Sequence, residues 1–182
     1  FNRNGKMYSD TSFQIDGDNG KMIHYRAREG GALYENEWYE SDWEKYYYGS
    51  DCAAYIGIHE ISGHLYGFSE YGAMYKNTTA TFDGENYVFD ENGYGTKLNN
   101  DGWTQVGTDW YYIQNSEIIK NKAIWIDESQ GYYGFDRNGK MYINTAFSIY
   151  NESGNPINYR ADINGKLYNS GWYQDQFEDY YY

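Results

Sequence analysis

The feature that most constrains this chain is that it repeats itself. Shifting the sequence by 134 positions places residues 1–48 on residues 135–182 without a gap, and 24 of the 48 aligned pairs are identical. Half that shift, 67 positions, aligns a second set of Phe, Gly and Met residues. A fixed internal period is the signature of a repeat architecture, in which each repeat contacts only its neighbours. The repetition therefore argues against a fold with one central core.

We interpret residues 1–182 as a single repeat array and expect it to be a fragment of a larger protein. Its long repeats are residues 1–67, 68–134 and 135–182, the last of which is truncated. Each long repeat divides again at turns followed by Met-Tyr or Leu-Tyr, and these turns lie 21 to 26 residues apart. The elementary repeat is therefore about 20–26 residues long.

Short aromatic runs separated by turn residues predict β-hairpins. Asn-Gly occurs five times, and this pair favours the type I′ turn because that turn needs positive φ at two successive positions. Runs such as 110–113 (WYYI) are typical of strands, and no stretch keeps the 3.6-residue apolar period of a helix. An isolated hairpin is marginal in water and must pack on the next one. The sequence predicts an all-β, elongated, solenoid-like array of β-hairpins with little or no helix.

Composition explains how such an array gains stability and which partners it excludes. Phe, Trp and Tyr make up 21% of the residues, so most rings are expected to form the core. The formal net charge of −13 removes the electrostatic attraction that nucleic-acid binding requires, so no nucleic-acid partner is expected. No apolar run approaches the roughly 20 residues that span a bilayer, so membrane insertion is not expected either. The single cysteine excludes an internal disulfide, and no motif calls for a metal or cofactor.

The segment from 102 to 113 (GWTQVGTDWYYI) resembles the choline-binding, or cell-wall-binding, repeats of Gram-positive surface proteins. Residues 135–141 (FDRNGKM) and Gly171-Trp172 with Tyr180 match the same pattern. Related aromatic repeats occur in the glucan-binding regions of glucosyltransferases and in clostridial toxins. The resemblance implies ligand sites between consecutive repeats, where aromatic rings surround a quaternary ammonium group through cation–π attraction.

The resemblance also implies which residues would form these sites. Trp103 and Trp110 would be two walls of a box, and Tyr132 or Trp125 would be the third. The remaining candidate ligand-binding residues are a methionine floor, the start of a second site and an earlier tryptophan with its tyrosine: Met141, Trp172, Tyr180, Trp38 and Tyr46. Because Glu precedes Trp38 where the family pattern has Gly, and several other positions depart from the pattern, stacking on a polysaccharide is an alternative to choline.

One string suggests an enzyme. His59, Glu60 and His64 resemble the H-E-x-x-H motif of zinc peptidases, but with one extra residue. In a regular helix this spacing would leave the two imidazoles roughly 140° apart. A shift of 67 positions aligns the string with residues 125–135, which read as two strands joined by a turn. We therefore expect no catalytic residues, and a metallopeptidase is only a remote alternative.

The sequence thus predicts a non-catalytic module that attaches a larger extracellular protein to the cell wall. Its expected partner is choline-decorated teichoic acid or a polysaccharide, bound through the aromatic sites between repeats. The first alternative is an adhesin that binds glucan or a host glycan on the same scaffold. A homodimer is compatible with the sequence.

Overall fold

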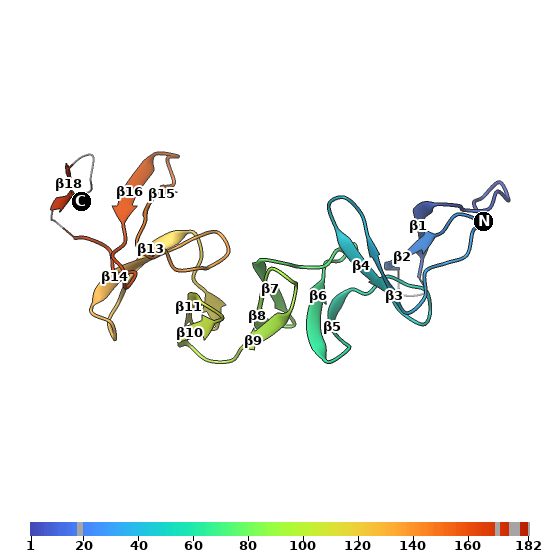
Figure 1. Ribbon diagram of the computed structural model, residues 1–182, viewed down its shortest axis with the longest axis horizontal. Helices are drawn as coiled ribbons and strands as arrows, with labels where there is room; N and C mark the ends of the chain where they lie inside the picture. Colours follow the sequence, from blue (N-terminus) through green and yellow to red (C-terminus); the bar gives the residue numbers. More distant parts are fainter. Residues whose placement is uncertain (18–19, 170–171, 175–178, 182) are drawn as a thin grey trace. The chain divides into compact units, whose positions relative to one another are not determined.

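The computed structural model describes residues 1–17, 20–169, 172–174 and 179–181, with side chains for the first two ranges. Within these residues the chain forms strands, bridges and turns, and none of them is helical. The strands, shown in Figure 1, are β1 (Thr11–Asp16), β2 (Met22–Ala27), β3 (Glu37–Glu40), β4 (Lys45–Tyr48), β5 (Gly57–Ile61), β6 (His64–Phe68), β7 (Thr78–Phe82), β8 (Glu85–Phe89), β9 (Gly95–Leu98), β10 (Gly102–Val106), β11 (Asp109–Gln114), β12 (Glu117–Ile118), β13 (Lys122–Ile126), β14 (Gly131–Phe135), β15 (Ala146–Tyr150), β16 (Pro156–Arg160), β17 (Trp172–Gln174) and β18 (Asp179–Tyr181).

Each strand pairs with its sequence neighbour. The described strands form two-stranded antiparallel hairpins, and in two places a third strand is added, giving β7-β8-β9 and β10-β11-β12. The predicted all-β array of hairpins is therefore confirmed for the described residues. No described segment is a helix of the length and hydrophobicity that crossing a membrane would require.

The turns differ from the prediction in an informative way. The tips with two successive positive φ values are Ser62-Gly63 (53° and 80°), Asp83-Gly84 (50° and 80°) and Asn115-Ser116 (54° and 63°). The Asn-Gly pairs at 92–93, 138–139 and 164–165 instead follow a hairpin, and only their glycines have positive φ. The expectation that these Asn-Gly pairs form hairpin tips is therefore wrong, because they form the linker that leads to the next repeat.

The aspartate that precedes these Asn-Gly pairs explains the linker turn. Asp136 accepts hydrogen bonds at Oδ1 from the backbone N–H groups of Asn138 (2.8 Å) and Lys140 (2.9 Å). Asp162 makes the same two bonds to the second and fourth residues after it. A side chain that bonds its own backbone two residues on stabilises a turn that competes with the hairpin tip.

The core lies at the ends of the hairpins' second strands. The last residue of that strand, or its counterpart near the strand's end, is at most 2% exposed in seven hairpins: Ala27, Tyr48, Phe68, Phe89, Ile113, Phe135 and Ala161. In five of them this residue forms a β-bridge to the residue six positions later, as Phe135 does with Met141. The bridge folds the linker back over its own hairpin, so each repeat closes on itself.

A second backbone contact joins one hairpin to the next. The N–H of Met141 donates to the carbonyl of Trp110 in the preceding hairpin at 2.8 Å. Met74 makes the same 2.8 Å bond to Lys45, and Leu167 makes it to Tyr132. Since the acceptor always lies three residues before the buried strand-end residue, equivalent positions can be compared from junction to junction.

The chain forms two compact units. Unit 1 comprises residues Phe1–Asp83 and Tyr87–Thr96, and unit 2 comprises Gly84–Asn86 and Lys97–Tyr182. The division into three long sequence repeats and the elongated shape stay predictions.

Candidate functional site

The aromatic cluster of unit 2 is built on one face of the β10–β11 hairpin. Trp103 pairs with Tyr112 across the two strands. Because side chains two residues apart in a strand share a face, Trp110 lies on the same side as Tyr112. The indole rings of Trp103 and Trp110 are perpendicular, with centroids 6.2 Å apart and an interplanar angle of 86°. Strand pairing therefore places two tryptophans at a right angle.

The next hairpin supplies a third wall. Tyr133 of β14 meets Trp103 edge to face, with centroids 5.0 Å apart, and Phe135 lies behind it at 6.0 Å from Trp103. The bridge and backbone bond of Met141 place its side chain beside these rings. A cavity of about 460 Å³ remains between the two hairpins, lined by Trp103, Trp110, Ser129, Tyr133, Met141, Ile143, Ile163 and Asn164. We call this cavity the Trp103 box.

Hydrogen bonds hold the walls of the Trp103 box. The indole N–H of Trp103 donates to Oγ of Ser129 at 2.8 Å. The hydroxyl of Tyr112 donates to the carboxylate of Glu128 at 3.2 Å. Burial raises the pKa of Tyr112, and the bond to Glu128 raises it further, so this hydroxyl stays neutral near pH 7. The rings are thus fixed before any ligand arrives.

Trp103, Trp110 and Met141 come together as the sequence predicts, but Tyr132 and Trp125 do not join them. Those two rings meet edge to face on the β13–β14 hairpin, with centroids 5.2 Å apart, and each is 44% exposed. The third wall is Tyr133. Tyr132 precedes it in the strand, so its side chain points to the opposite face.

Loop length explains why Trp125 does not correspond to Trp103. The tip between β10 and β11 has two residues and the tip between β13 and β14 has four, so an alignment that matches the tryptophans misplaces them. Counted from the buried strand end, the equivalent of Trp103 is Ala123, which pairs with Gly134 as Trp103 pairs with Tyr112. Tyr132 is equivalent to Trp110 in both alignments, since each lies three residues before its buried strand end, and it borders the next cavity instead of the Trp103 box.

The following junction shows what an alanine at this position does. A cavity of about 400 Å³ is lined by Ala123, Tyr132, Asn158, Tyr159, Leu167, Tyr168 and Asn169. It has tyrosines in place of Trp110 and Tyr133, but no ring in place of Trp103. This cavity therefore lacks one wall of the box.

Trp38 in unit 1 occupies the position that Trp103 occupies in unit 2. It pairs with Tyr47, and its ring lies 5.0 Å from Tyr66 and 6.1 Å from Phe68 in the next hairpin. The position of Trp110 is taken by Lys45, whose Nζ lies 4.8 Å from the centroid of the Trp38 ring. A cation of the protein itself therefore covers this tryptophan face.

Tyr46, the tyrosine predicted to accompany Trp38, points to the other face of its strand. It lines a groove of about 380 Å³ with Ser12, Phe13, Gln14, His24, Tyr25, Tyr48 and Tyr71. Burial raises its pKa, and so does its hydroxyl's hydrogen bond to the Glu44 carboxylate. Trp172 and Tyr180 lie in β17 and β18, but their side chains fall outside the described residues.

The string that resembles a zinc motif lies in a hairpin. His59 is in β5 and His64 in β6, with the turn Ser62-Gly63 between the strands. Each imidazole stacks on a different tyrosine: His59 on Tyr55 at 3.9 Å and His64 on Tyr94 at 4.1 Å. Among the described residues, no group of three His, Cys, Asp or Glu side chains is placed to hold a metal ion.

Comparisons with known proteins are consistent with an aromatic repeat but do not assign a family. No protein-family model matches the chain. Glucosyltransferase-S of Streptococcus mutans serotype c is 25% identical over 186 residues, which cover all of this chain and 12% of that protein.

Similar solved structures include choline-binding proteins of Streptococcus pneumoniae. Choline binding protein F is 18% identical with a TM-score of 0.42, and the match covers 86% of this chain and 47% of that one. The choline-binding domain of CbpL is 16% identical with a TM-score of 0.43, over 93% of this chain and 91% of that one. The chain thus spans about one eighth of the glucosyltransferase and about half of choline binding protein F.

Proposed function

We propose that the chain is a non-catalytic binding module whose Trp103 box holds a quaternary ammonium group. The observation that carries this proposal is the open cavity walled by Trp103, Trp110 and Tyr133, with Met141 beside them. A quaternary ammonium donates no hydrogen bonds, so the faces of aromatic rings recognise it, at roughly 0.5–2 kcal/mol for each good contact. A box with perpendicular indoles offers such faces from several directions.

The charge of the chain favours the same class of ligand. With 27 Asp and Glu against 14 Lys and Arg, the field around the protein attracts cations and repels polyanions. The lysine next to the box, Lys140, is held by Asp109 at 2.7 Å, so its charge is compensated. The choline cation on a cell-wall polymer such as teichoic acid therefore fits the box better than an anionic group of the same polymer.

The module would attach a larger extracellular protein to the cell wall. A single box of this kind binds weakly, but linked boxes on one array raise the overall affinity through effective concentration. In this proposal the protein acts outside the cell and the array positions a neighbouring domain. The two stacked histidines of the β5–β6 hairpin contribute packing, and no step of catalysis is assigned to them.

Titration with choline tests the ammonium proposal. Tryptophan fluorescence is followed while choline is added, and 3,3-dimethylbutan-1-ol is added in parallel as an uncharged analogue of the same shape. We expect saturable quenching by choline at millimolar concentrations and a response to the alcohol at least about tenfold weaker, because the cation–π term is lost. Equal binding of the two compounds would contradict an ammonium site. If neither compound changes the fluorescence, the Trp103 box binds neither of them.

A glucan- or host-glycan-binding adhesin is the second candidate. The similarity to glucosyltransferase-S runs along the whole chain, and exposed rings such as Tyr150 (67% exposed) and Trp43 (86%) offer faces for sugar stacking. A glycan array read with the intact chain separates the candidates. Binding to an unmodified polysaccharide with no response to choline would favour the adhesin.

A further inference from the structure

The junction between the β1–β2 and β3–β4 hairpins in unit 1 differs in chemistry from the Trp103 box. In β1–β2, Gln14 pairs with His24 and Ser12 pairs with Arg26. Because these positions alternate along their strands, all four side chains share one face. That face meets tyrosines of the next hairpin, and the backbone bond from Ala54 to the His24 carbonyl (2.8 Å) holds the two hairpins together. A polar face thus lies opposite an aromatic one.

The groove between them presents both hydrogen-bonding groups and a ring face. Nε2 of Gln14 lies 3.2 Å from Nδ1 of His24. Among the described contacts this leaves the Gln14 carbonyl oxygen and His24 Nε2 without a partner. Tyr71, 64% exposed, borders the groove and meets the His24 ring at 89°, with centroids 6.1 Å apart. The volume of about 380 Å³ is in the range of small-molecule sites.

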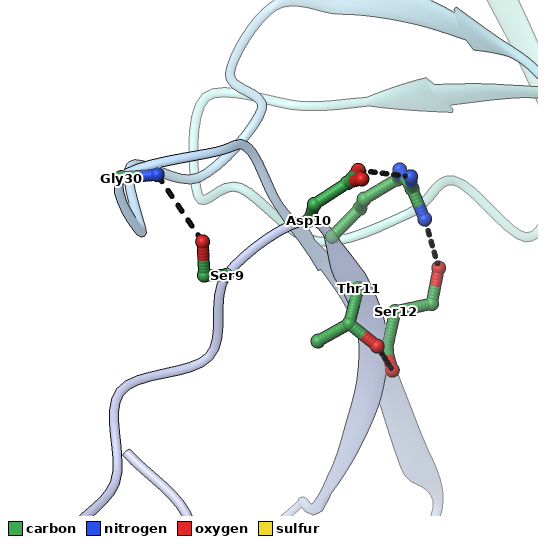
Figure 2. A network of polar contacts seen from close by, with 6 residues as sticks. Ser9, Asp10, Thr11, Ser12 and Gly30 are labelled. Atoms are coloured by element: carbon green, nitrogen blue, oxygen red, sulfur yellow. Dashed lines mark hydrogen bonds and ion pairs between the residues drawn. The ribbon is translucent and has the colours of Figure 1, made fainter.

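A cation of the protein itself already lies next to the groove. The Arg26 guanidinium is 4.0 Å from the ring centroid of Tyr39, which does not line the groove, and covers that ring face. The same guanidinium donates hydrogen bonds to the Asp10 carboxylate at 2.9 Å and to the Ser12 hydroxyl at 3.3 Å. Figure 2 shows both contacts as dashed lines ending at the labelled Asp10 and Ser12. The positive charge is therefore compensated, and the field of a chain with net charge −13 still opposes an anion.

The third sequence repeat carries the same arrangement. At the positions of Gln14 and His24 it has Ser148 and Asn158, and the Ser148 hydroxyl lies 2.7 Å from Asn158 Oδ1. The stacked rings beside each polar pair also agree: Phe13 and Tyr25 are 5.5 Å apart, and so are their counterparts Phe147 and Tyr159. Polar side chains therefore recur at one place in the hairpin.

We propose that this groove binds a neutral pyranose unit of a saccharide. The apolar face of the sugar lies on Tyr71, and its hydroxyls exchange hydrogen bonds with Gln14 and His24. Both donors and acceptors are needed by such a ligand, and amide and imidazole groups supply both. The site shares no residue with the Trp103 box, so it goes beyond the ammonium proposal and deepens only the glycan candidate.

The test uses NMR of the intact chain with three neutral probes: maltotriose, isomaltotriose and cellotriose, each at up to roughly 20 mM, because a few such contacts give millimolar affinity. We expect at least one probe to shift the backbone amides around Gln14, His24 and Tyr71. Tyr71→Ala should weaken that probe's binding by about tenfold or more, and His24→Ala should do so as well. Shifts confined to the Trp103 box, or none with any probe, would overturn the proposal.

The chain offers a matched control. Tyr94 is also exposed (39%) and also stacks on a histidine, His64, but it lines no described groove. Tyr94→Ala should leave saccharide binding unchanged, and equal losses from Tyr71→Ala and Tyr94→Ala would overturn the site. Trp103→Ala should abolish the choline response and keep the saccharide shifts, so failure of one proposal is distinguishable from failure of the other.

Discussion

Two junctions between hairpins have the same backbone contacts, but a lysine covers the tryptophan in one and an open cavity borders it in the other. In unit 1, Trp38 packs on the next hairpin's Tyr66 and Phe68, and in unit 2, Trp103 packs on Tyr133 and Phe135. The residue three positions before the buried strand end is Lys45 in one and Trp110 in the other, and both carbonyls accept a bond from a methionine N–H at 2.8 Å. The side chain at that position differs in kind.

We infer from the comparison that the residue at this position decides whether a junction is open to a cation. Lys45 puts an ammonium over the Trp38 ring, which is where a ligand cation would lie, whereas Trp110 adds a ring and leaves a cavity. An intramolecular cation is present at high effective concentration and therefore competes well with a weak ligand. On this basis we propose that the Trp38 junction is structural and that the Trp103 junction binds the ligand.

The largest effect is expected from removing each tryptophan. Trp103→Ala and Trp38→Ala should each destabilise the protein by about 2–3 kcal/mol, since both half-buried rings pack on a neighbouring hairpin. Only Trp103→Ala should abolish choline binding. Urea unfolding and choline titration of both variants measure the two effects, and a loss of binding in Trp38→Ala would break the comparison.

The second largest effect is expected from exchanging Trp110 and Lys45. Trp110→Lys should weaken choline binding by roughly 30-fold, because about 2 kcal/mol of cation–π attraction is replaced by a competing ammonium. Lys45→Trp should add a second binding site in unit 1. Isothermal titration calorimetry gives the stoichiometry. An unchanged stoichiometry in a folded Lys45→Trp variant would show that Lys45 is not what closes the Trp38 junction.

A smaller effect distinguishes two adjacent tyrosines. Tyr133→Leu keeps apolar volume but removes a ring face from the box, so choline binding should fall by about tenfold. Tyr132→Leu changes a ring outside the box and should have little effect. Fluorescence titration of both variants with choline measures the two effects. A larger loss of binding in Tyr132→Leu than in Tyr133→Leu would show that Tyr132 is the third wall.

The smallest effect concerns the histidine hairpin of unit 1. His59→Ala should cost about 1 kcal/mol through the lost stacking on Tyr55, with no change in choline binding. EDTA should leave the unfolding midpoint of the wild-type protein unchanged, because no group of three His, Cys, Asp or Glu side chains among the described residues is placed to hold a metal ion. Thermal unfolding with EDTA and with added zinc measures this, and a midpoint that depends on zinc would reopen the metal hypothesis.

Much of the fold could be predicted from the sequence, because repetition and short aromatic runs leave few alternatives. The repeats, the hairpins and the contact between the rings of Trp103 and Trp110 follow from residues that are close in the chain. The role of Asn-Gly could not be predicted from the pair alone. The preceding Asp136 or Asp162 bonds the backbone and favours a linker turn over a hairpin tip.

The site was harder to predict because it joins residues from different hairpins. Tyr133 and Tyr132 are adjacent and chemically identical, and only the strand register places one of them toward Trp103. The lysine over Trp38 has no signal of its own, since a charged residue in a short strand is usually solvated. Counting back from the buried strand end aligns Tyr133 with Tyr66 and Trp110 with Lys45, but the buried residue is evident only once the hairpins are paired.

The bond from a methionine or leucine N–H to the carbonyl of the preceding hairpin uses no side chain. Mutation of a residue that lines a junction therefore leaves this hydrogen bond in place. The side chains of one junction can change while those of the neighbouring junctions stay the same. Such a chain can acquire several recognition specificities, one junction at a time, while the backbone contacts between its hairpins stay the same.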